Sequence, residues 1–188
     1  MKTSISTTLS VFLSTTVLAA VFMILFSSPL SAQQPASSSA DVQREAMRQL
    51  SFLAGHWSGP ATIVRGPGEA LHLTQTEDVE YKLDGLVLLV EGKSTSADGK
   101  VAFGALATIA YDDASRTYRF RAYHDGHYLD TELSVRANGF SWSFTDGPAH
   151  IVNTMHLTGK REWNEVTEVT VGGNPPQRSV DMLLQHLP

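Results

Sequence analysis

The sequence predicts an all-β protein, an up-and-down antiparallel β-barrel of about ten strands preceded by one short helix. Turn signals recur at short intervals along the chain, and many of them are Asx-Gly pairs such as Asp84-Gly85 and Asn138-Gly139. Between the turns, apolar and polar residues alternate as they do in half-buried strands. Short connections make neighbouring strands antiparallel. A β-sandwich is the alternative fold, but its Greek-key crossings need longer connections than this sequence contains.

The first 32 residues have the order of a secretory signal peptide. Lys2 supplies a positive charge, residues 9–26 form an apolar run, and small residues lead to a cleavage site that we expect after Ala32. An uncleaved membrane anchor is the alternative, because the run is as long as some spanning helices. Ser10 and Ser14 dilute the run and favour cleavage. We therefore expect an exported protein, periplasmic or secreted, with no stable membrane insertion after cleavage.

Composition narrows the classes of partner. Without its first 32 residues the 188-residue chain keeps 156, which suits a single domain with a substantial core. Cysteine is absent, which excludes a disulfide framework, a thiolate metal site and a lipid-anchored cysteine. Once Lys2 is removed, 13 basic and 19 acidic residues remain. This acidic balance argues against nucleic acid or an anionic membrane surface as a partner.

Two segments precede the strands. Residues 33–40 are rich in Gln, Pro, Ser and Ala, which is typical of a flexible tether. Residues 41–53 carry apolar side chains at helical spacing, and we expect a short amphipathic helix there that covers or props one end of the barrel. The barrel domain is thus expected to span residues 41–188. The apolar positions of the helix are Val42, Ala46, Met47, Leu50 and Leu53.

Alternation predicts which side of each strand faces the interior. Phe103 and Ala105 share the apolar parity of their strand, and Phe120 and Trp142 are the bulkiest apolar residues of theirs. Ten strands exceed the about eight whose side chains can fill a barrel, so we expect a cavity lined by these four residues. The expected strands cover residues 57–64, 70–82, 86–96, 100–111, 116–124, 127–136, 139–145, 149–158, 161–171 and 177–187.

The entry to the strands carries a recognisable motif, residues 52–59 (FLAGHWSG). Gly55 can adopt the positive φ that ends a helix, and the Trp57 indole can plug one end of a barrel. A Gly-x-Trp entry followed by an antiparallel meander resembles the calycin group of lipocalins, fatty-acid-binding proteins and nitrobindin-like domains. The sequence of the motif is most similar to that of lipocalin-like bacterial domains of unknown function. In calycins an arginine from the barrel end packs across this tryptophan, and the resemblance implies that Arg178 does so here.

Within the calycin group, the resemblance to nitrobindins implies a haem cofactor. Nitrobindins carry Gly-x-Trp-x-Gly-x-Gly, whereas this chain matches through Gly59 and has Ala61 at the last glycine. His186 stands near the C-terminus, as the haem ligand of nitrobindins does. A partly exposed histidine at a frayed chain end is the favoured explanation of its position. We therefore expect no cofactor, with haem on His186 as the alternative.

Polar residues within the strands offer two further candidates. Gln75 and Glu77 share the inward parity of an otherwise apolar face and could orient a ligand, although a β-bulge in this strand would turn both outward. His124 and His127 flank an Asp-Gly turn and could act as two metal ligands. Because no further ligands cluster with them in the sequence, a turn with solvated histidines is the favoured explanation, and no metal site is predicted.

Catalytic motifs are missing from the sequence. It contains no Gly-x-Ser-x-Gly elbow, and Gly66-Pro67-Gly68 is followed by no helix that could bind phosphate. We therefore predict a non-enzymatic barrel that holds a small apolar or amphipathic molecule. A haem barrel with nitrobindin-like peroxynitrite chemistry is one alternative. An envelope interaction module, with a barrel filled by its own side chains, is the other.

Overall fold

A computed structural model describes residues 38–64 and 70–188 of the chain. The leader expected at residues 1–32, most of the expected tether and the Gly66-Pro67-Gly68 turn lie outside the described residues. Within the described part, no helix has both the length and the apolar character needed to cross a membrane.

The described part begins with two short helices, α1 (Ser39–Met47) and η1 (Arg48–Leu53). Ser38 and Asp41 form a capping box that satisfies the first backbone N–H groups of α1. The sequence predicts one helix over residues 41–53, but its second half is a 3-10 helix. Met47, Leu50 and Leu53 are all fully buried, and their spacing of three matches the three residues per turn of a 3-10 helix. The 3-10 winding therefore places all three side chains on one face.

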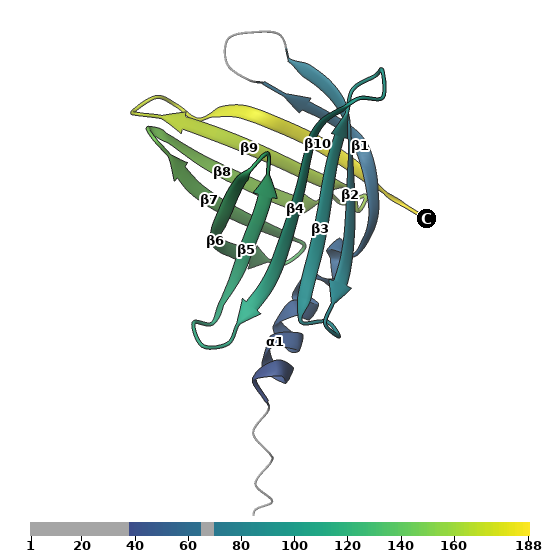
Figure 1. Cartoon of the computed structure of the whole chain (residues 1–188), viewed down its shortest axis with the longest axis vertical. Coiled ribbons are helices and arrows are strands. Elements are labelled where there is room, and N and C mark those ends of the chain that lie inside the picture. The colour runs from purple at the N-terminus through teal and green to yellow at the C-terminus, as the bar shows by residue number, and fades with distance from the viewer. Residues whose placement is uncertain (1–37, 65–69) are drawn as a thin grey trace, which may run out of the picture. The chain divides into compact units, whose positions relative to one another are not determined.

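Ten strands follow and close into a single antiparallel barrel, which confirms the predicted fold class (Figure 1). Each strand pairs with its neighbours in sequence, and the first strand also pairs with the last, so the sandwich alternative is wrong. The strands are β1 (Gly55–Ile63), β2 (Leu71–Lys82), β3 (Val87–Thr95), β4 (Val101–Asp112), β5 (Thr117–His124), β6 (His127–Arg136), β7 (Gly139–Asp146), β8 (Ala149–Leu157), β9 (Trp163–Val171) and β10 (Gln177–Leu187).

The two helices close one end of the barrel, which we call the plug end (Figure 1). The phenol groups of Tyr81 and Tyr118 donate hydrogen bonds of 2.7 Å to the carbonyls of Met47 and Ala46. These bonds tie the end of α1, where backbone carbonyls lack helical partners, to β2 and β5. The core around them is buried and apolar, and includes Leu50, Leu53, Leu88, Ile109, Leu133, Phe140, Met155 and Leu184.

At the opposite end, which we call the open end, Ala61, Leu73 and Ser94 on β1 to β3 are buried, but several inward-facing side chains of the other strands are only partly buried. This holds for Ala105 on β4, Phe120 on β5, Trp142 on β7 and Ile151 on β8. The wall also loosens here, because β6 and β7 pair only between Leu133–Arg136 and Gly139–Trp142. Solvent therefore reaches the inner surface of the barrel from the open end.

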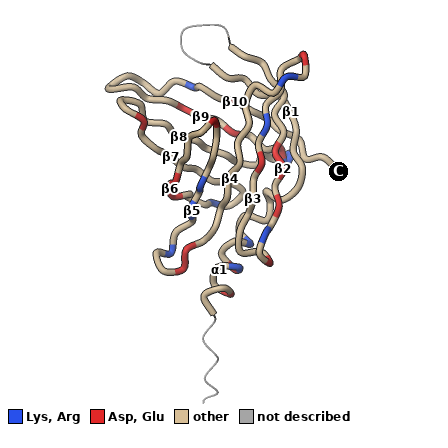
Figure 2. The backbone as a smooth tube through the Cα atoms, in the orientation of Figure 1, with Lys and Arg blue, Asp and Glu red and all other residues tan. Residues whose placement is uncertain are grey.

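Charged residues of both signs are interspersed along β2 to β6 (Figure 2). Arg119 and Arg121 on β5 both pair with Asp130 on β6. These pairs hold the pKa of the Asp130 carboxyl at about 2, well below its usual range, chiefly through the hydrogen bond from Arg119. They form a solvated outer face, as alternation predicts for the two arginines.

Candidate ligand site inside the barrel

Gln75 and Glu77 face the interior of the barrel from β2. The pairing of β2 with both β1 and β3 runs without a register shift through this segment, so the bulge alternative is wrong. The two residues are only 6% and 7% exposed. Gln75 donates a 2.7 Å hydrogen bond through Nε2 to Oε1 of Glu77, and Ser94 donates through its hydroxyl to Oε1 of Gln75. This side of the barrel therefore holds a connected polar group.

A glycine on β3 makes room for the Glu77 carboxyl. A Cβ atom on Gly92 would lie 2.9 Å from both carboxylate oxygens of Glu77, which is closer than such contacts allow. Directly across from Gly92 on β4 stands Ala105, another small residue. The absence of a side chain at Gly92 therefore lets the buried carboxyl pack against the backbone of β3.

A second polar group faces the interior from β8 and β9. Asn153 donates through Nδ2 to Oε1 of Glu165 at 2.8 Å and to the Thr167 hydroxyl at 2.9 Å. The indole N–H of Trp163 donates to the other carboxylate oxygen of Glu165 at 2.7 Å. Asn153 is 2% exposed, and its Oδ1 atom has no hydrogen-bond partner among the described residues.

Sequence reasoning missed this second group, although a signal for it exists. Glu165 and Thr167 share the parity of Trp163, and Asn153 shares that of Met155. Because side chains alternate along a strand, the residues two positions away from a large inward-facing apolar residue also face the interior, and this rule would have identified the second group. We call the inward-facing polar residues of both groups the polar layer, which consists of Gln75, Glu77, Ser94, Asn153, Glu165 and Thr167.

The two carboxyl groups of the polar layer are both buried, and the charge of Glu165 acts on Glu77. Burial raises the pKa of Glu77 to about 8, and the charge of Glu165 adds to this effect more than that of Asp78 does, while the hydrogen bond from Gln75 opposes it. Burial also raises the pKa of Glu165, against the hydrogen bonds from Asn153 and Trp163. Glu77 therefore keeps its proton at neutral pH.

Aromatic side chains line the interior nearer the open end. The rings of Phe120 and Trp142 stack with centroids 5.2 Å apart, and those of Trp142 and Phe144 with centroids 6.0 Å apart. All three are partly buried, and we call them the aromatic wall. Two of the predicted cavity residues thus come together here. Phe103 lies apart from them and packs against His124 with ring centroids 4.2 Å apart.

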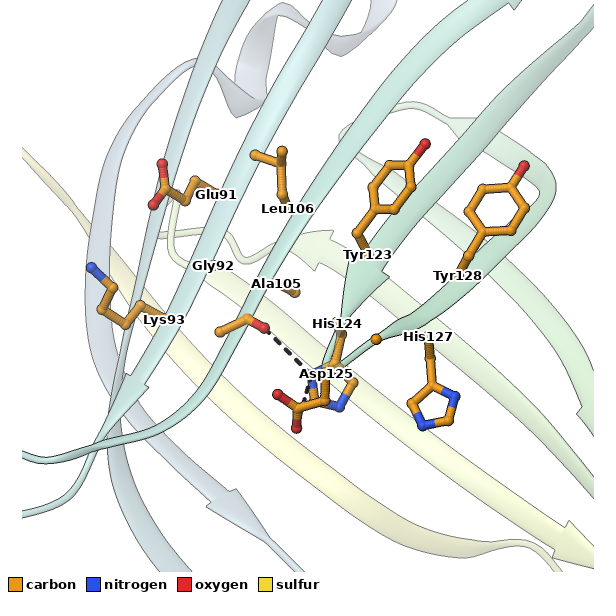
Figure 3. Close-up of a pocket in the computed structure, with 12 residues that line it drawn as sticks. Glu91, Gly92, Lys93, Ala105, Leu106, Tyr123, His124, Asp125, His127 and Tyr128 are labelled. Carbon is orange, nitrogen blue, oxygen red and sulfur yellow. Dashed lines mark hydrogen bonds and ion pairs between the residues drawn. The ribbon is translucent and has the colours of Figure 1, made fainter.

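An open hollow of about 620 Å³ lies on the outer face of the barrel, across β3 to β6 (Figure 3). Its lining includes the exposed, outward-facing residues Leu106, Tyr123 and Tyr128, and the two tyrosine rings lie 5.4 Å apart. Ala105 and His124 also contribute to it, but the hollow is not the interior cavity that the sequence predicts. Nδ1 of His124 lies 3.4 Å from the carbonyl oxygen of Gly104. The described residues contain no cluster of three or more His, Cys, Asp or Glu side chains arranged to hold a metal ion.

Trp57 lies at the plug end, 2% exposed, with its N–H donating to the Leu53 carbonyl at 2.8 Å. Gly55 precedes it with a φ of 126°. The expectation that Arg178 packs across Trp57 is wrong. Arg178 is exposed and pairs with Asp181 at the opposite end of β10.

The residue that contacts Trp57 from β10 is His186, directly opposite in the β1–β10 pairing, with ring centroids 4.8 Å apart. Nε2 of His186 packs against the backbone of Gly55, so closely that a Cβ atom there would clash with it. An iron ligand needs a free ring nitrogen directed at the metal. This packing therefore does not fit haem ligation by Nε2.

Comparison with known proteins supports the fold alone. No family model matches this chain, and no curated protein matches it either. The crystal structure of Rv2717c from M. tuberculosis is similar, with a TM-score of 0.58 and 14% sequence identity. The likeness covers 76% of this chain and 98% of that one. At this identity the likeness is one of fold, and fold and site together define a β-barrel protein with a polar layer in its interior.

Proposed function

We propose that this protein is an exported, calycin-like barrel that binds a small apolar or amphipathic molecule in its interior, without catalysis. The aromatic wall is the observation that carries the proposal. Its three rings face inward, stack on one another and remain partly exposed at the open end. Apolar surface of this kind gains about 25 cal/mol for each Å² that a ligand removes from water.

The contrast between the two ends of the barrel argues against a barrel filled by its own side chains. At the plug end, Leu88, Leu184 and Ile109 are at most 1% exposed. At the open end, inward residues on β4 and β7 such as Ala105 and Trp142 are still partly exposed, although Leu73 on β2 and Ser94 on β3 are buried there. A filled barrel would bury both sets alike. The difference favours an interior that accepts a ligand over an interaction module.

Titration with the uncharged fluorescent probe N-phenyl-1-naphthylamine tests the proposal. Wild-type protein should bind the probe saturably, with an increase in its fluorescence. Ala105→Trp should bind it weakly, because the indole would enter the interior beside Gly92. Leu106→Trp is the matched control, since Leu106 is 40% exposed on the outer face of the same strand, and it should bind like wild type.

Circular dichroism establishes that each variant is folded. Failure of the wild type to bind the probe would refute the proposal, as would unchanged binding by a folded Ala105→Trp variant. In the first case the interaction module with a filled barrel takes its place.

A further inference from the structure

We infer that the bound molecule is an amphipathic amine, whose protonated nitrogen binds to Glu77, Glu165 and Asn153 in the polar layer. This inference rests on the proposed function and adds to it the chemistry of the ligand's polar group. Its basis is the hydrogen-bonding capacity that the polar layer leaves unused.

The N–H donors of the polar layer are already committed. Nε2 of Gln75 donates to Glu77 and to the Thr76 carbonyl, and Nδ2 of Asn153 donates to Glu165 and Thr167. The indole N–H of neighbouring Trp163 donates to Glu165 as well. What remains is mostly oxygen that accepts hydrogen bonds, with the hydroxyl of Thr167 and the protonated carboxyl of Glu77 as the other donors. A ligand that complements this layer must therefore supply donors.

Asn153 provides an independent indication of a missing donor. Its amide oxygen is buried, has no partner among the described residues, and belongs to the same amide group that contacts Glu165. Buried polar atoms of folded proteins are almost always hydrogen-bonded, so an orphaned acceptor calls for an explanation. A ligand N–H directed at Oδ1 supplies one.

Among ligand groups that donate hydrogen bonds, the carboxyl groups of the polar layer favour a positively charged ammonium. In the described part of the chain, no Lys, Arg or His forms an ion pair with Glu77 or Glu165. Burial raises the pKa of both carboxyls, and the charge of Glu165 raises that of Glu77 further, with no cation to offset either effect. An ammonium has three donors, no acceptor and the compensating charge. A fatty-acid carboxylate would instead add a negative charge and further acceptors beside two carboxyl groups.

The aromatic wall suits the apolar part of such a molecule. Along β9 the inward residues continue from Glu165 through Thr167 to the partly buried Val169, and along β8 from Asn153 to the partly buried Ile151. Both runs lead from the polar layer toward the open end. A ligand with its nitrogen at the layer would place its apolar chain against these residues and the aromatic wall.

A series of four ligands with the same ten-carbon chain tests the inference by displacement of N-phenyl-1-naphthylamine at pH 7. Decylamine should bind about ten- to a hundredfold more tightly than decanol, the range that charge-assisted hydrogen bonds contribute. Decanoic acid should bind most weakly. Decyltrimethylammonium carries the charge without N–H donors and should fall between decylamine and decanol.

A bound ammonium lowers the pKa of a carboxyl beside it and so favours the carboxylate. Glu77→Gln and Glu165→Gln keep the size of the side chain but cannot ionise, so each should abolish most of the preference for decylamine while decanol binding stays unchanged. Two variants are used so that the test survives if one fails to fold. Glu91→Gln, at an exposed position of β3, is the matched control and should behave like wild type.

Decanol and decanoic acid binding as tightly as decylamine would overturn the inference and leave the proposed function standing. A preference for decylamine that survives in both folded interior variants would overturn it too. Failure of all four ligands to displace the bound probe would overturn the inference alone, whereas failure of the wild type to bind the probe itself would overturn the proposed function.

Discussion

Replacement of Glu77 by glutamine should change how the stability of this protein depends on pH. Glu77 is buried in the polar layer beside Gln75, and burial raises the pKa of its carboxyl to about 8 from an ordinary value of 4.5. A glutamine keeps the oxygen that accepts the hydrogen bond from Gln75 and cannot ionise. The substitution therefore removes a titration while leaving the packing almost unchanged.

The sign follows from proton linkage. Because the folded state holds this proton more tightly than the unfolded chain, the contribution of Glu77 to stability is fully present below pH 4.5 and is lost as pH rises through about 8. At about 1.36 kcal/mol per pKa unit, the difference between the two values corresponds to at most about 5 kcal/mol. Wild type and Glu77→Gln should thus be similarly stable at pH 5, whereas at pH 9 the variant should be more stable by several kcal/mol.

Urea unfolding at pH 5, 6, 7, 8 and 9, followed by tryptophan fluorescence, measures this difference. Equal m-values would show that the same surface is exposed on unfolding in both proteins. Glu165 titrates in both wild type and Glu77→Gln, so its contribution to the pH dependence of stability cancels in part from their difference. Glu91→Gln serves as the exposed control. If the unfolding free energies of wild type and Glu77→Gln run parallel from pH 5 to pH 9, then the carboxyl is not held neutral in the interior and the reasoning fails.

Two further predictions concern the plug end and the leader. Trp57→Ala should lower the free energy of unfolding by about 3–5 kcal/mol, as large-to-small core changes do, and Arg178→Ala by less than about 1 kcal/mol because its ion pair is exposed. Equal losses in urea melts would contradict the burial difference. Intact-mass analysis of exported protein should find residues 1–32 missing, and their retention would instead support a membrane anchor.

Much of the fold follows from the sequence by itself. Asx-Gly turns and the period-two alternation predict ten strands, and the strand bounds agree with the structure to within two residues at each end. These signals are local, because a turn and the alternation beside it are encoded within a few neighbouring residues. The inward direction of Gln75 and Glu77 is local for the same reason, since Leu73 and Val79 on the same strand share their parity.

Only the tertiary structure decides what meets inside the barrel. Alternation gives the face on which a side chain lies, but closure of β1 on β10 brings Glu77 on β2 close enough to Glu165 on β9 for one charge to act on the other. The register of that closure also sets His186, rather than Arg178, against Trp57. Register and closure depend on pairings between segments far apart in sequence. The polar layer is therefore a property of the closed barrel, which no single strand reveals.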